Sequence, residues 1–311
     1  MGPATDQGSV PLSAIVRSAA SLKSGPMHLF MALALLAANA PEAVVLKPVA
    51  NMYAEPTDDA EVVSQAIYGT NIAVVETRPG WLHVRTPDDY TGWMPADDLR
   101  RLGAGEKPYA SGSASGGRVA WVESLFAHIY REPNVTKRRP LITAPFETRL
   151  EVIAEPQDDW RWLEVRLPDD RSGWLQRGDV SFESQPLSIE GTIELSRRFL
   201  GLPYTWGGTS SFGYDCSGFT QMLCRRRGTR IPRDADVQAA WQGVVPVKRE
   251  DLKPGDLLFF GSAADNITHT GMYIGEGKFI NAATWIRPVV QICDLSDPHW
   301  TRLLVACRRL Q

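Results

Sequence analysis

The chain of 311 residues is short of cysteine and histidine, with four of the first and five of the second. Four cysteines cannot cross-link a chain of this length into a disulfide scaffold. No C-x-x-C pair occurs, and no group of cysteine and histidine has the spacing of a zinc site. We therefore expect no metal and no cofactor, and we expect most of the cysteines to be small buried apolar side chains.

Net charge is also small. The formal net charge is −3 and 22% of the residues are charged, which is ordinary for a globular protein and gives no general attraction to nucleic acid. A short basic run at residues 225–227 is interpreted as the solvated face of a helix. We expect no nucleic-acid partner. A monomer is favoured, although the sequence leaves the oligomeric state open.

Long apolar runs are limited to residues 29–38, a stretch too short to span a bilayer. Arg17 and Lys23 precede it, and the sequence Ala38-Asn39-Ala40 resembles a small-residue cleavage site. This pattern predicts a signal peptide and export to the periplasm or cell envelope. The alternative is an amphiphilic helix that packs on the body of a cytoplasmic protein. Neither interpretation predicts a stable membrane span in the mature chain.

An internal repeat organises the first half of the chain. Residues 80–99 and 159–180 share the pattern W-L-x-V-R-x-P-D-D-x-x-G-W, in which Trp81 aligns with Trp162. Alternating apolar and polar residues, a Pro-Asp-Asp break and a Gly-Trp restart predict a hairpin with a polar turn. Each unit has about 60 residues of short strands, which predicts a small barrel. The repeats resemble bacterial SH3-like domains, which often accompany enzymes and binders of the bacterial cell wall.

The character of the chain changes after about residue 185. Residues 188–201 and 215–228 have helical spacing, and each stretch closes at a glycine. Strands are predicted at residues 256–260, 270–275, 278–283 and 302–310, which makes this part α+β. We expect an N-terminal extension at 1–42, SH3-like domains at 43–105 and 117–184, and a catalytic domain at 186–311. The glycine- and serine-rich residues 110–118 are the expected linker.

Cys216 stands where the second predicted helix begins, directly after Asp215. Asp215 is a plausible N-cap, and the free N–H groups and dipole of a helix N-terminus favour a thiolate there. Ser217 and Gly218 are small and let a substrate approach. Because a thiol attacks as thiolate, this setting predicts a nucleophile with a lowered pKa. The other three cysteines lack it.

A base and an orienting group follow on predicted strands. His269 opens a strand in the same domain as Cys216, whereas His299 is expected in a loop. A turn at Gly275 and Gly277 can return Asn281 beside His269 on the neighbouring strand. An amide at that place fixes the imidazole tautomer.

Five ordered motifs carry a more specific resemblance: PYTWGG, DCSGF, PGDLLFF, HTGMYIG and KFINAA, between residues 203 and 283. The order is typical of the NlpC cysteine peptidases of bacterial cell walls. The resemblance implies a papain-like fold, Cys216 as nucleophile, His269 as base and then acid, and Asn281 as the third group. Tyr204 matches a tyrosine that lines the active site of the family, where its phenol can donate to an oxyanion. Trp206 is expected to be a packing residue.

The arrangement of two SH3-like units before an NlpC domain resembles the subgroup that cleaves γ-D-glutamyl–diamino acid bonds of muropeptides. In that subgroup the first SH3-like domain closes the site, so that only stem peptides with a free N-terminal L-Ala fit. An acid and a tyrosine of that domain bind the amine, and the local patterns place them at Glu61 and Tyr90. The second repeat has Arg171 in the comparable turn.

The peptidase side supplies the remaining expected binding residues. The segment IPRDAD, residues 231–236, matches a family segment that lines the pocket, and Asp234 is the candidate partner for a charged substrate group. Ala235 replaces a serine that the subgroup often has. Asp215 and Ser217 are expected to flank the pocket.

Two other functions remain open at this point: a non-catalytic wall-binding protein, and an amidase or acyltransferase on the same fold. The sequence also leaves open whether the diamino acid is diaminopimelate or lysine, and whether the role is remodelling, recycling or attack.

Overall fold

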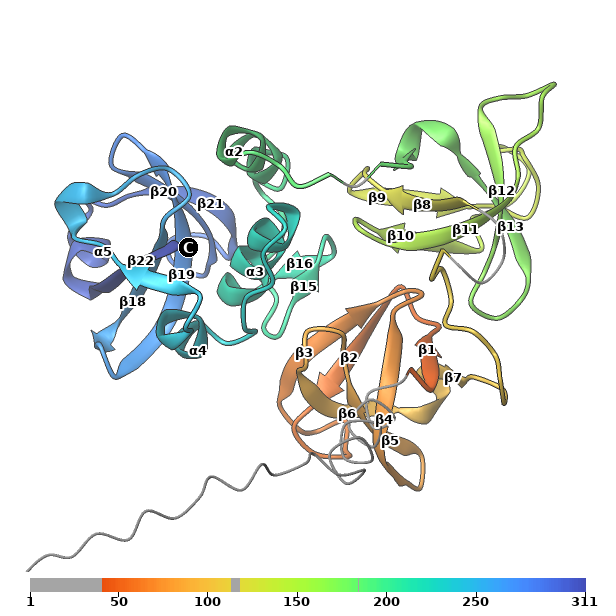
Figure 1. Ribbon diagram of the computed structural model, residues 1–311, viewed down its shortest axis with the longest axis horizontal. Coiled ribbons are helices and arrows are strands. Elements are labelled where there is room, and N and C mark those ends of the chain that lie inside the picture. Colours follow the sequence, from red (N-terminus) through yellow and green to blue (C-terminus); the bar gives the residue numbers. More distant parts are fainter. Residues whose placement is uncertain (1–40, 113–117, 184) are drawn as a thin grey trace, which may run out of the picture. The chain divides into compact units, whose positions relative to one another are not determined.

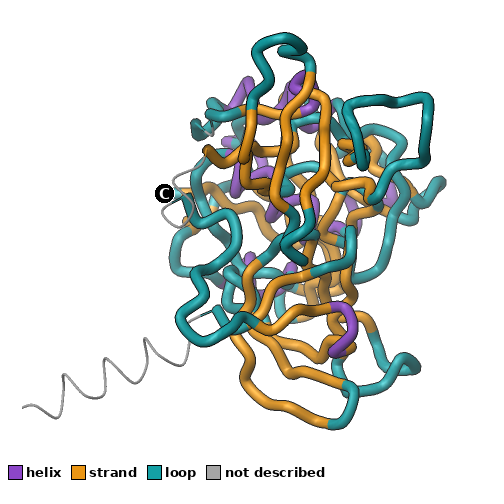
Figure 2. Tube along the Cα trace, turned by 90° about the vertical axis from the view of Figure 1, so that its right-hand side faces the viewer, coloured by secondary structure: helices purple, strands orange, loops and turns teal. Residues whose placement is uncertain are grey.

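Figure 1 shows the computed structural model of the protein, which describes residues 41–112, 118–183 and 185–311. All of these residues belong to one compact unit. The predicted signal peptide lies outside the described residues. Strands and loops make up most of the described chain, and its helices are few and short (Figure 2). In this part of the chain no helix is long and apolar enough to cross a membrane.

The first repeat folds into a seven-stranded sheet of order β3-β2-β6-β5-β4-β1-β7. The predicted hairpin is confirmed: Leu82 pairs with Met94 across it, and both side chains are buried in the core of this sheet. Asp89 adopts a φ of 64° in the turn. The strands are β1 Ala43–Val45, β2 Val49–Tyr53, β3 Val62–Ile67, β4 Asn71–Arg78, β5 Trp81–Arg85, β6 Thr91–Pro95 and β7 Leu99–Arg101, with the short helix η1 Ala96–Asp98 before β7.

The second repeat forms a five-stranded sheet of order β13-β12-β11-β8-β14, with β9 and β10 paired separately. Its hairpin repeats the first, because Leu163 pairs with Leu175 and Asp170 has a φ of 66°. The elements are β8 Arg118–Val122, β9 Phe126–Ile129, β10 Ile142–Pro145, β11 Arg149–Ala154, β12 Trp162–Arg166, β13 Ser172–Gln176, η2 Arg177–Asp179 and β14 Val180–Ser181.

The expected linker 110–118 is wrong at both ends. Ala110 is buried, and its backbone N–H donates to the Glu151 carboxylate at 2.7 Å. Tyr109 before it is buried as well, with its hydroxyl donating to the backbone oxygen of Arg166. Arg118 already begins β8. The chain between the repeats is therefore anchored at its end to the second repeat and at its start to both, because Tyr109 also exchanges two hydrogen bonds with Asn71 of β4.

The C-terminal part is a six-stranded sheet of order β17-β22-β18-β19-β20-β21, with helices on both faces. The helices are α2 Ile189–Arg197, α3 Cys216–Arg226, α4 Ala235–Ala240 and α5 Pro298–Leu303, with η3 Arg249–Asp251. The strands are β15 Thr209–Ser210, β16 Gly213–Tyr214, β17 Val244–Pro246, β18 Leu257–Ala263, β19 Asn266–Gly275, β20 Lys278–Ala283, β21 Val289–Asp294 and β22 Leu304–Leu310.

Strand β18 explains how this sheet is covered. Leu257 and Phe259 pack into the cluster that contains α3, whereas Leu258 and Phe260 pack into the cluster that contains Trp300 of α5. Because side chains alternate between the faces of a strand, a continuous apolar run requires cover on both sides. The α+β layout, α2 and α3 agree with the sequence, and α4 and α5 were not predicted.

Two expectations about individual residues are corrected here. His299 lies on α5 rather than in a loop, and its ring stacks on Trp285 with 3.7 Å between centroids. The basic run at 225–227 is not a solvated face, because Arg225 pairs with Glu147 at 2.5 Å and Arg226 pairs with Glu123 at 2.8 Å. Both carboxylates belong to the second repeat, so this end of α3 is held by ion pairs.

Candidate active site

Cys216 is the first residue of α3 and is 7% exposed. The predicted N-cap is confirmed, because the Asp215 carboxylate accepts from the backbone N–H of Gly218 at 2.7 Å. The backbone of Gly208 packs so closely against the first turn that a Cβ on Gly218 would collide with its carbonyl oxygen. Only glycine fits at 218, so the turn that presents the sulfur is fixed in position by the PYTWGG segment.

The sulfur of Cys216 lies against β19. The backbone N–H groups of Thr270 and Ser217 lie close enough to the sulfur to lower the pKa of the thiol, and Thr270 is joined by its peptide bond to His269. Helix α3 packs on β19 and β20, the strands that carry the other two predicted groups. The predicted nucleophile and the predicted base therefore lie on elements that pack against each other, and Thr270, the neighbour of His269, lies beside the sulfur.

The expected low pKa of the thiol is wrong for the site as it stands. Burial, followed by the nearby charge of Asp215, raises the pKa of Cys216 to about 12, and the N–H groups of Thr270 and Ser217 oppose this only in part. Desolvation disfavours the charged form of any acid, and here it outweighs the helix N-terminus. The resting sulfur is therefore a thiol, and its proton must leave as the sulfur attacks.

His269 is suited to take that proton. Burial lowers the pKa of its imidazole to about 4, although the hydrogen bond that the ring donates to Asn281 partly offsets this effect. The ring stacks on Trp300 of α5, with 5.1 Å between centroids and 28° between planes, and lies 5.7 Å from the ring of Phe260. These two aromatic side chains cover part of the imidazole, which is half-buried. The ring is neutral at neutral pH and can act as a base.

Asn281 fixes the orientation of His269. Its side-chain oxygen lies 2.9 Å from Nε2 of the ring, as the predicted hairpin required. The Asn281 amide nitrogen donates to the backbone oxygen of Gln291 at 3.3 Å and to the sulfur of Cys293 at 3.5 Å, so the oxygen is the atom that faces the ring. Nε2 then carries the proton, and Nδ1 is left free as the base.

The position of Asn281 depends on the strand beside it. Asn281 is fully buried on β20, which lies between β19 and β21 and is not an edge strand. A Cβ at Gly271 would lie 3.0 Å from the Cβ of Asn281 and 2.8 Å from the ring of Phe279. The absence of a side chain at 271 lets the amide reach His269.

Tyr204 lies at the same site. Burial raises the pKa of its phenol, and the charge of Asp215, together with that of Cys216 whenever its thiol is ionised, raises it further. Its backbone N–H donates to the oxygen of Pro288 at 2.8 Å, which anchors the segment to the loop before β21. The phenol therefore keeps its proton close to the sulfur. This is the protonation state that an oxyanion donor requires.

Asp215 and Ser217 are engaged below the pocket by a residue that the sequence analysis did not assign. Arg233 is 3% exposed and donates to the Asp215 carboxylate at 2.6 Å and 3.1 Å and to the Ser217 hydroxyl at 2.8 Å. Its Nε donates to the hydroxyl of Ser64 on β3 at 3.0 Å. This buried guanidinium joins the start of α3 to the first repeat. The only indication of Arg233 in the sequence is its place directly before Asp234 in the segment IPRDAD.

Tyr90 and Asp234 are brought together from distant parts of the chain. The Tyr90 hydroxyl donates to the Asp234 carboxylate at 3.4 Å. Burial and the charge of Asp234 raise the pKa of Tyr90 to about 12, and burial also raises the pKa of Asp234. A first-repeat tyrosine and a peptidase acid thus form one polar group at the site.

Glu61 makes a different contact. Its carboxylate accepts from the indole N–H of Trp206 at 3.1 Å, and no described hydrogen bond joins it to Tyr90 or Asp234. Trp206 is 62% exposed, so the expectation that it is a packing residue is wrong. No local sequence pattern indicates this pairing, because the two residues lie 145 positions apart.

No group of three metal-ligating side chains is found in residues 41–112, 118–183 and 185–311. The described site instead contains a thiol at a helix start, a neutral imidazole oriented by an amide, and a phenol donor. This combination defines a papain-like cysteine peptidase.

Comparison with known proteins identifies the family. Residues 201–309 match the NlpC/P60 family, and residues 52–99 match the bacterial dipeptidyl-peptidase Sh3 domain. A gamma-D-glutamyl-L-lysine dipeptidyl-peptidase of Bacillus cereus is 30% identical over 268 residues, which cover 81% of this chain and 76% of that protein. A protein of the same name from Bacillus subtilis is 30% identical over 261 residues, which cover 81% of this chain and 82% of that protein.

A solved structure supports the same assignment. The crystal structure of an NlpC/P60 family protein from Bacillus cereus matches with a TM-score of 0.73 and 26% identity, covering 86% of this chain and 99% of that one. The chain belongs to the NlpC/P60 family of peptidases. The fold class and the enzyme class predicted from the sequence are confirmed.

Proposed function

We propose that this peptidase hydrolyses the amide bond between the γ-carboxyl of D-Glu and the diamino acid of peptidoglycan stem peptides, and that it selects stems with a free N-terminal L-Ala. The contact between Tyr90 and Asp234 carries the proposal: it joins a first-repeat residue to Asp234, and the neighbouring Arg233 binds the Asp215 carboxylate directly before Cys216. The names of the Bacillus relatives, which specify a γ-D-glutamyl-L-lysine bond, support the same choice.

The polar groups beside the site suit an ammonium ion. Asp234 offers a half-buried carboxylate, and because the Tyr90 hydroxyl donates its O–H to Asp234, the lone pairs of the Tyr90 oxygen can accept from the ammonium ion. Glu61 adds an exposed carboxylate held by Trp206. A charge-assisted hydrogen bond to a partly buried carboxylate is stronger than a neutral one. An acetylated amine loses both the charge and two of its donors, so it binds poorly here.

The chemistry follows from the protonation states. Nδ1 of His269 takes the proton of Cys216 as the sulfur attacks the γ-carbonyl carbon. The Tyr204 phenol and the backbone N–H of Cys216 donate to the developing oxyanion. His269 then gives its proton to the departing amine of the diamino acid. Water, deprotonated by His269, attacks the thioester and frees L-Ala-D-Glu. Asn281 stabilises the imidazolium in each step by holding Nε2–H.

The product of the reaction tests this function. Wild-type protein incubated with L-Ala-γ-D-Glu-L-Lys or its diaminopimelate counterpart should release L-Ala-D-Glu, detected by mass spectrometry, and Cys216→Ala should release none. The ratio of the two rates identifies the diamino acid. A binder without activity would retain the tripeptide uncut, and an acyltransferase would yield the dipeptide joined to an added amine. Either result would contradict the proposal.

We also propose that the enzyme acts outside the cytoplasmic membrane as a monomer, since the apolar residues 29–38 have the pattern of a signal peptide. Sequencing the N-terminus of protein recovered from the cell envelope tests the location, and light scattering tests the mass. A chain recovered from the cytoplasm with Met1 in place would contradict export.

A further inference from the structure

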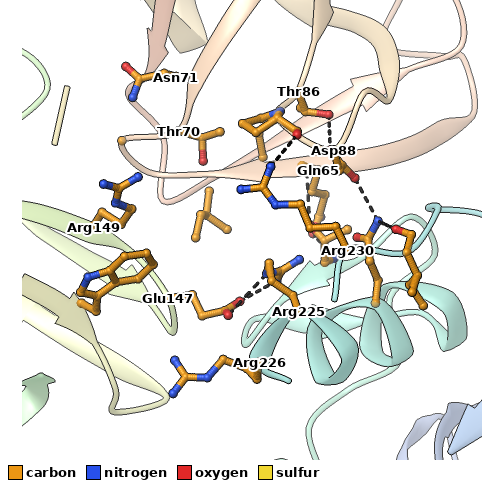
Figure 3. A pocket seen from close by; sticks show the side chains of 18 of the residues that line it. Gln65, Thr70, Asn71, Thr86, Asp88, Glu147, Arg149, Arg225, Arg226 and Arg230 are labelled. Atoms are coloured by element: carbon orange, nitrogen blue, oxygen red, sulfur yellow. Dashed lines mark hydrogen bonds and ion pairs between the residues drawn. The ribbon is translucent and has the colours of Figure 1, made fainter. Parts of the chain in front are cut away.

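A cavity of about 440 Å³ lies away from the catalytic groups, where both repeats and the end of α3 meet. Figure 3 shows its lining side chains. The first repeat contributes residues from Gln65 to Asp88, the second repeat contributes Trp121, Glu147 and Arg149, and the peptidase part contributes Gln221 to Ile231. None of the predicted catalytic or substrate-binding residues lines it. The cavity is of the size that holds a small ligand.

The charge of the lining is unbalanced. Four guanidinium groups and two carboxylates line the cavity: Arg149, Arg225, Arg226 and Arg230, with Asp88 and Glu147. With Glu123 counted as the partner of Arg226, one positive charge is in excess. Arg225 is paired with Glu147 at 2.5 Å, and Arg226 is paired with Glu123 at 2.8 Å. These two arginines therefore have carboxylate partners already.

Arg149 and Arg230 have no carboxylate partner among the described residues. Arg149 donates to the backbone oxygen of Ala110 and lies over the ring of Trp121, and its buried Nε has no hydrogen-bond partner. Burial without a counter-ion also lowers the pKa of Arg149. Arg230 donates only to the backbone oxygen of Pro87, at 3.2 Å. An orphaned buried donor in a native protein calls for an explanation, such as strain, a bound water or a bound ion.

The two unpaired arginines are placed to act together. Arg149 and Arg230 lie on opposite sides of the cavity in Figure 3, with Thr70 between them. Guanidinium groups bind carboxylate and phosphate groups through paired N–H donors. A ligand with one acid group at each end would neutralise both. The Thr70 hydroxyl can bond the middle of such a ligand. The side-chain amides of Asn71 and Gln65 are already bonded, the first to Tyr109 and the second to Asn51 and Thr209.

The cavity shares two structural elements with the active site. Thr86, Pro87 and Asp88 line it, and Tyr90 follows in the same turn. Gln221 of α3 donates to Asp88 at 3.0 Å, five residues after Cys216. A ligand that binds the Arg230 guanidinium competes with its hydrogen bond to the backbone oxygen of Pro87. Binding can therefore shift the turn that positions Tyr90.

We propose that this cavity is a second binding site, which takes a small dianion with acid groups at both ends, and that its occupancy alters substrate binding through the 86–90 turn. The acid groups are carboxylates or phosphates, and both bind guanidinium in the same way. This site is independent of the reaction assigned to Cys216.

Isothermal titration calorimetry of the full chain tests the site directly. The probes are malonate, succinate, glutarate and adipate for carboxylates, pyrophosphate for phosphates, and acetate as the single-acid control. Titration in Cys216→Ala protein avoids turnover. We expect one saturable site with an optimum length among the diacids and much weaker binding of acetate. If pyrophosphate exceeds every diacid, the ligand is a phosphate compound. If no probe binds saturably, or if acetate binds as well as the diacids, the proposal is overturned.

Substitutions locate the site. Arg149→Gln and Arg230→Gln should each weaken the best probe by about tenfold, the loss of one charge-assisted contact. Arg161→Gln is the matched control, because Arg161 is exposed, pairs with Asp159 and lies outside the cavity. If Arg149→Gln does not fold, Arg149→Lys keeps the charge and should still lose the paired contact. Unchanged affinity in both cavity variants would overturn the site.

A kinetic measurement tests the coupling. The best probe should change the KM for tripeptide in wild-type protein, by about fivefold if the coupling is of ordinary size, and should not do so in Arg149→Gln. Saturating probe that leaves KM and kcat unchanged would overturn the coupling. Absence of peptidase activity would contradict the proposed function and leave the calorimetric result standing.

Discussion

The two repeats fold the same hairpin from the same pattern and yet do different things. In each, a strand that begins with tryptophan leads to Pro-Asp-Asp, and the second aspartate adopts a φ near 65°: 64° at Asp89 and 66° at Asp170. The next residue is Tyr90 in the first repeat and Arg171 in the second. Tyr90 reaches Asp234 of the peptidase part, whereas Arg171 pairs only with Asp169, two residues away.

This difference shows that the turn holds the following residue in the same place in both repeats, and that the identity of that residue decides which group it contacts. Asp88 of the first repeat binds Gln221 of α3, and its counterpart Asp169 is occupied by Arg171. The second repeat instead contacts α3 through Glu147 and Glu123. We infer that the first repeat shapes the substrate site and that the second repeat supports the helix that carries Cys216.

The largest effect is expected on stability, from breaking the buried link between the first repeat and α3. Arg233→Leu leaves the Asp215 carboxylate buried without its partner, which should reduce the free energy of unfolding by about 3–5 kcal/mol. The comparable change in the second repeat, Arg171→Leu, removes an exposed pair and should cost less than about 0.5 kcal/mol. Chemical denaturation of both variants measures the contrast. Equal losses would mean that the buried pair has no special role.

The next effect is on catalysis. Tyr90→Phe removes the hydroxyl that donates to Asp234 and should lower kcat/KM for free-amine tripeptide by about tenfold. Arg171→Gln changes the residue in the equivalent turn and should leave kcat/KM unchanged. Steady-state measurement of kcat/KM for both variants and the wild type tests this difference. A larger loss in Arg171→Gln would reverse the roles assigned to the repeats.

The third effect concerns His269 on β19, and it is a change in kcat/KM that is small at neutral pH and large at low pH. Because burial lowers the pKa of His269 to about 4, its neutral, basic form persists down to that pH and is lost below it. For the wild type, kcat/KM should fall about tenfold per pH unit below about pH 4. Trp300→Leu lets water reach the ring, so the acid limb should move up toward the ordinary histidine value of 6.5.

Trp285→Leu is the control for this pH profile. Trp285 stacks on His299 rather than on His269, so its loss should leave the acid limb in place. An acid limb that stays near pH 4 in Trp300→Leu, or one that moves equally in both variants, would mean that stacking on Trp300 does not set the pKa of His269.

The smallest effect is expected at the exposed edge of the site. Trp206→Phe keeps the aromatic ring and removes the N–H that holds Glu61, which should raise KM by about twofold with kcat unchanged. Glu61→Gln should raise KM more, because it also removes the charge. If the two variants rank in the opposite order, the carboxylate of Glu61 does not contact the substrate amine.

Much of the site could be predicted because its signals are local. Asp215 before an apolar helix predicted the cap and the place of Cys216, and two glycines in a turn predicted that Asn281 returns to His269. The hairpins followed from alternation and the Pro-Asp-Asp break. The helix α5 was missed although Asp297 caps it and Pro298 begins it, because six residues give too short a periodic pattern.

Long-range contacts and electrostatics could not be predicted from these patterns. Arg233, Trp206 and Trp300 owe their roles to partners that the fold brings to them, and nothing in the adjacent sequence names those partners. The high pKa of Cys216 has the same origin: a helix N-terminus is visible in the sequence, whereas the burial that outweighs it comes from the packing of α3 on β19.

The most direct measurement of the central claim is the ratio of kcat/KM for L-Ala-γ-D-Glu-L-Lys to that for the same peptide with its amine acetylated. We predict a ratio of about 100 or more in the wild type, since two contacts to a charged amine are lost, and a ratio reduced about tenfold in Tyr90→Phe. A ratio near one in the wild type would contradict the claim that the first repeat selects a free amine beside Cys216.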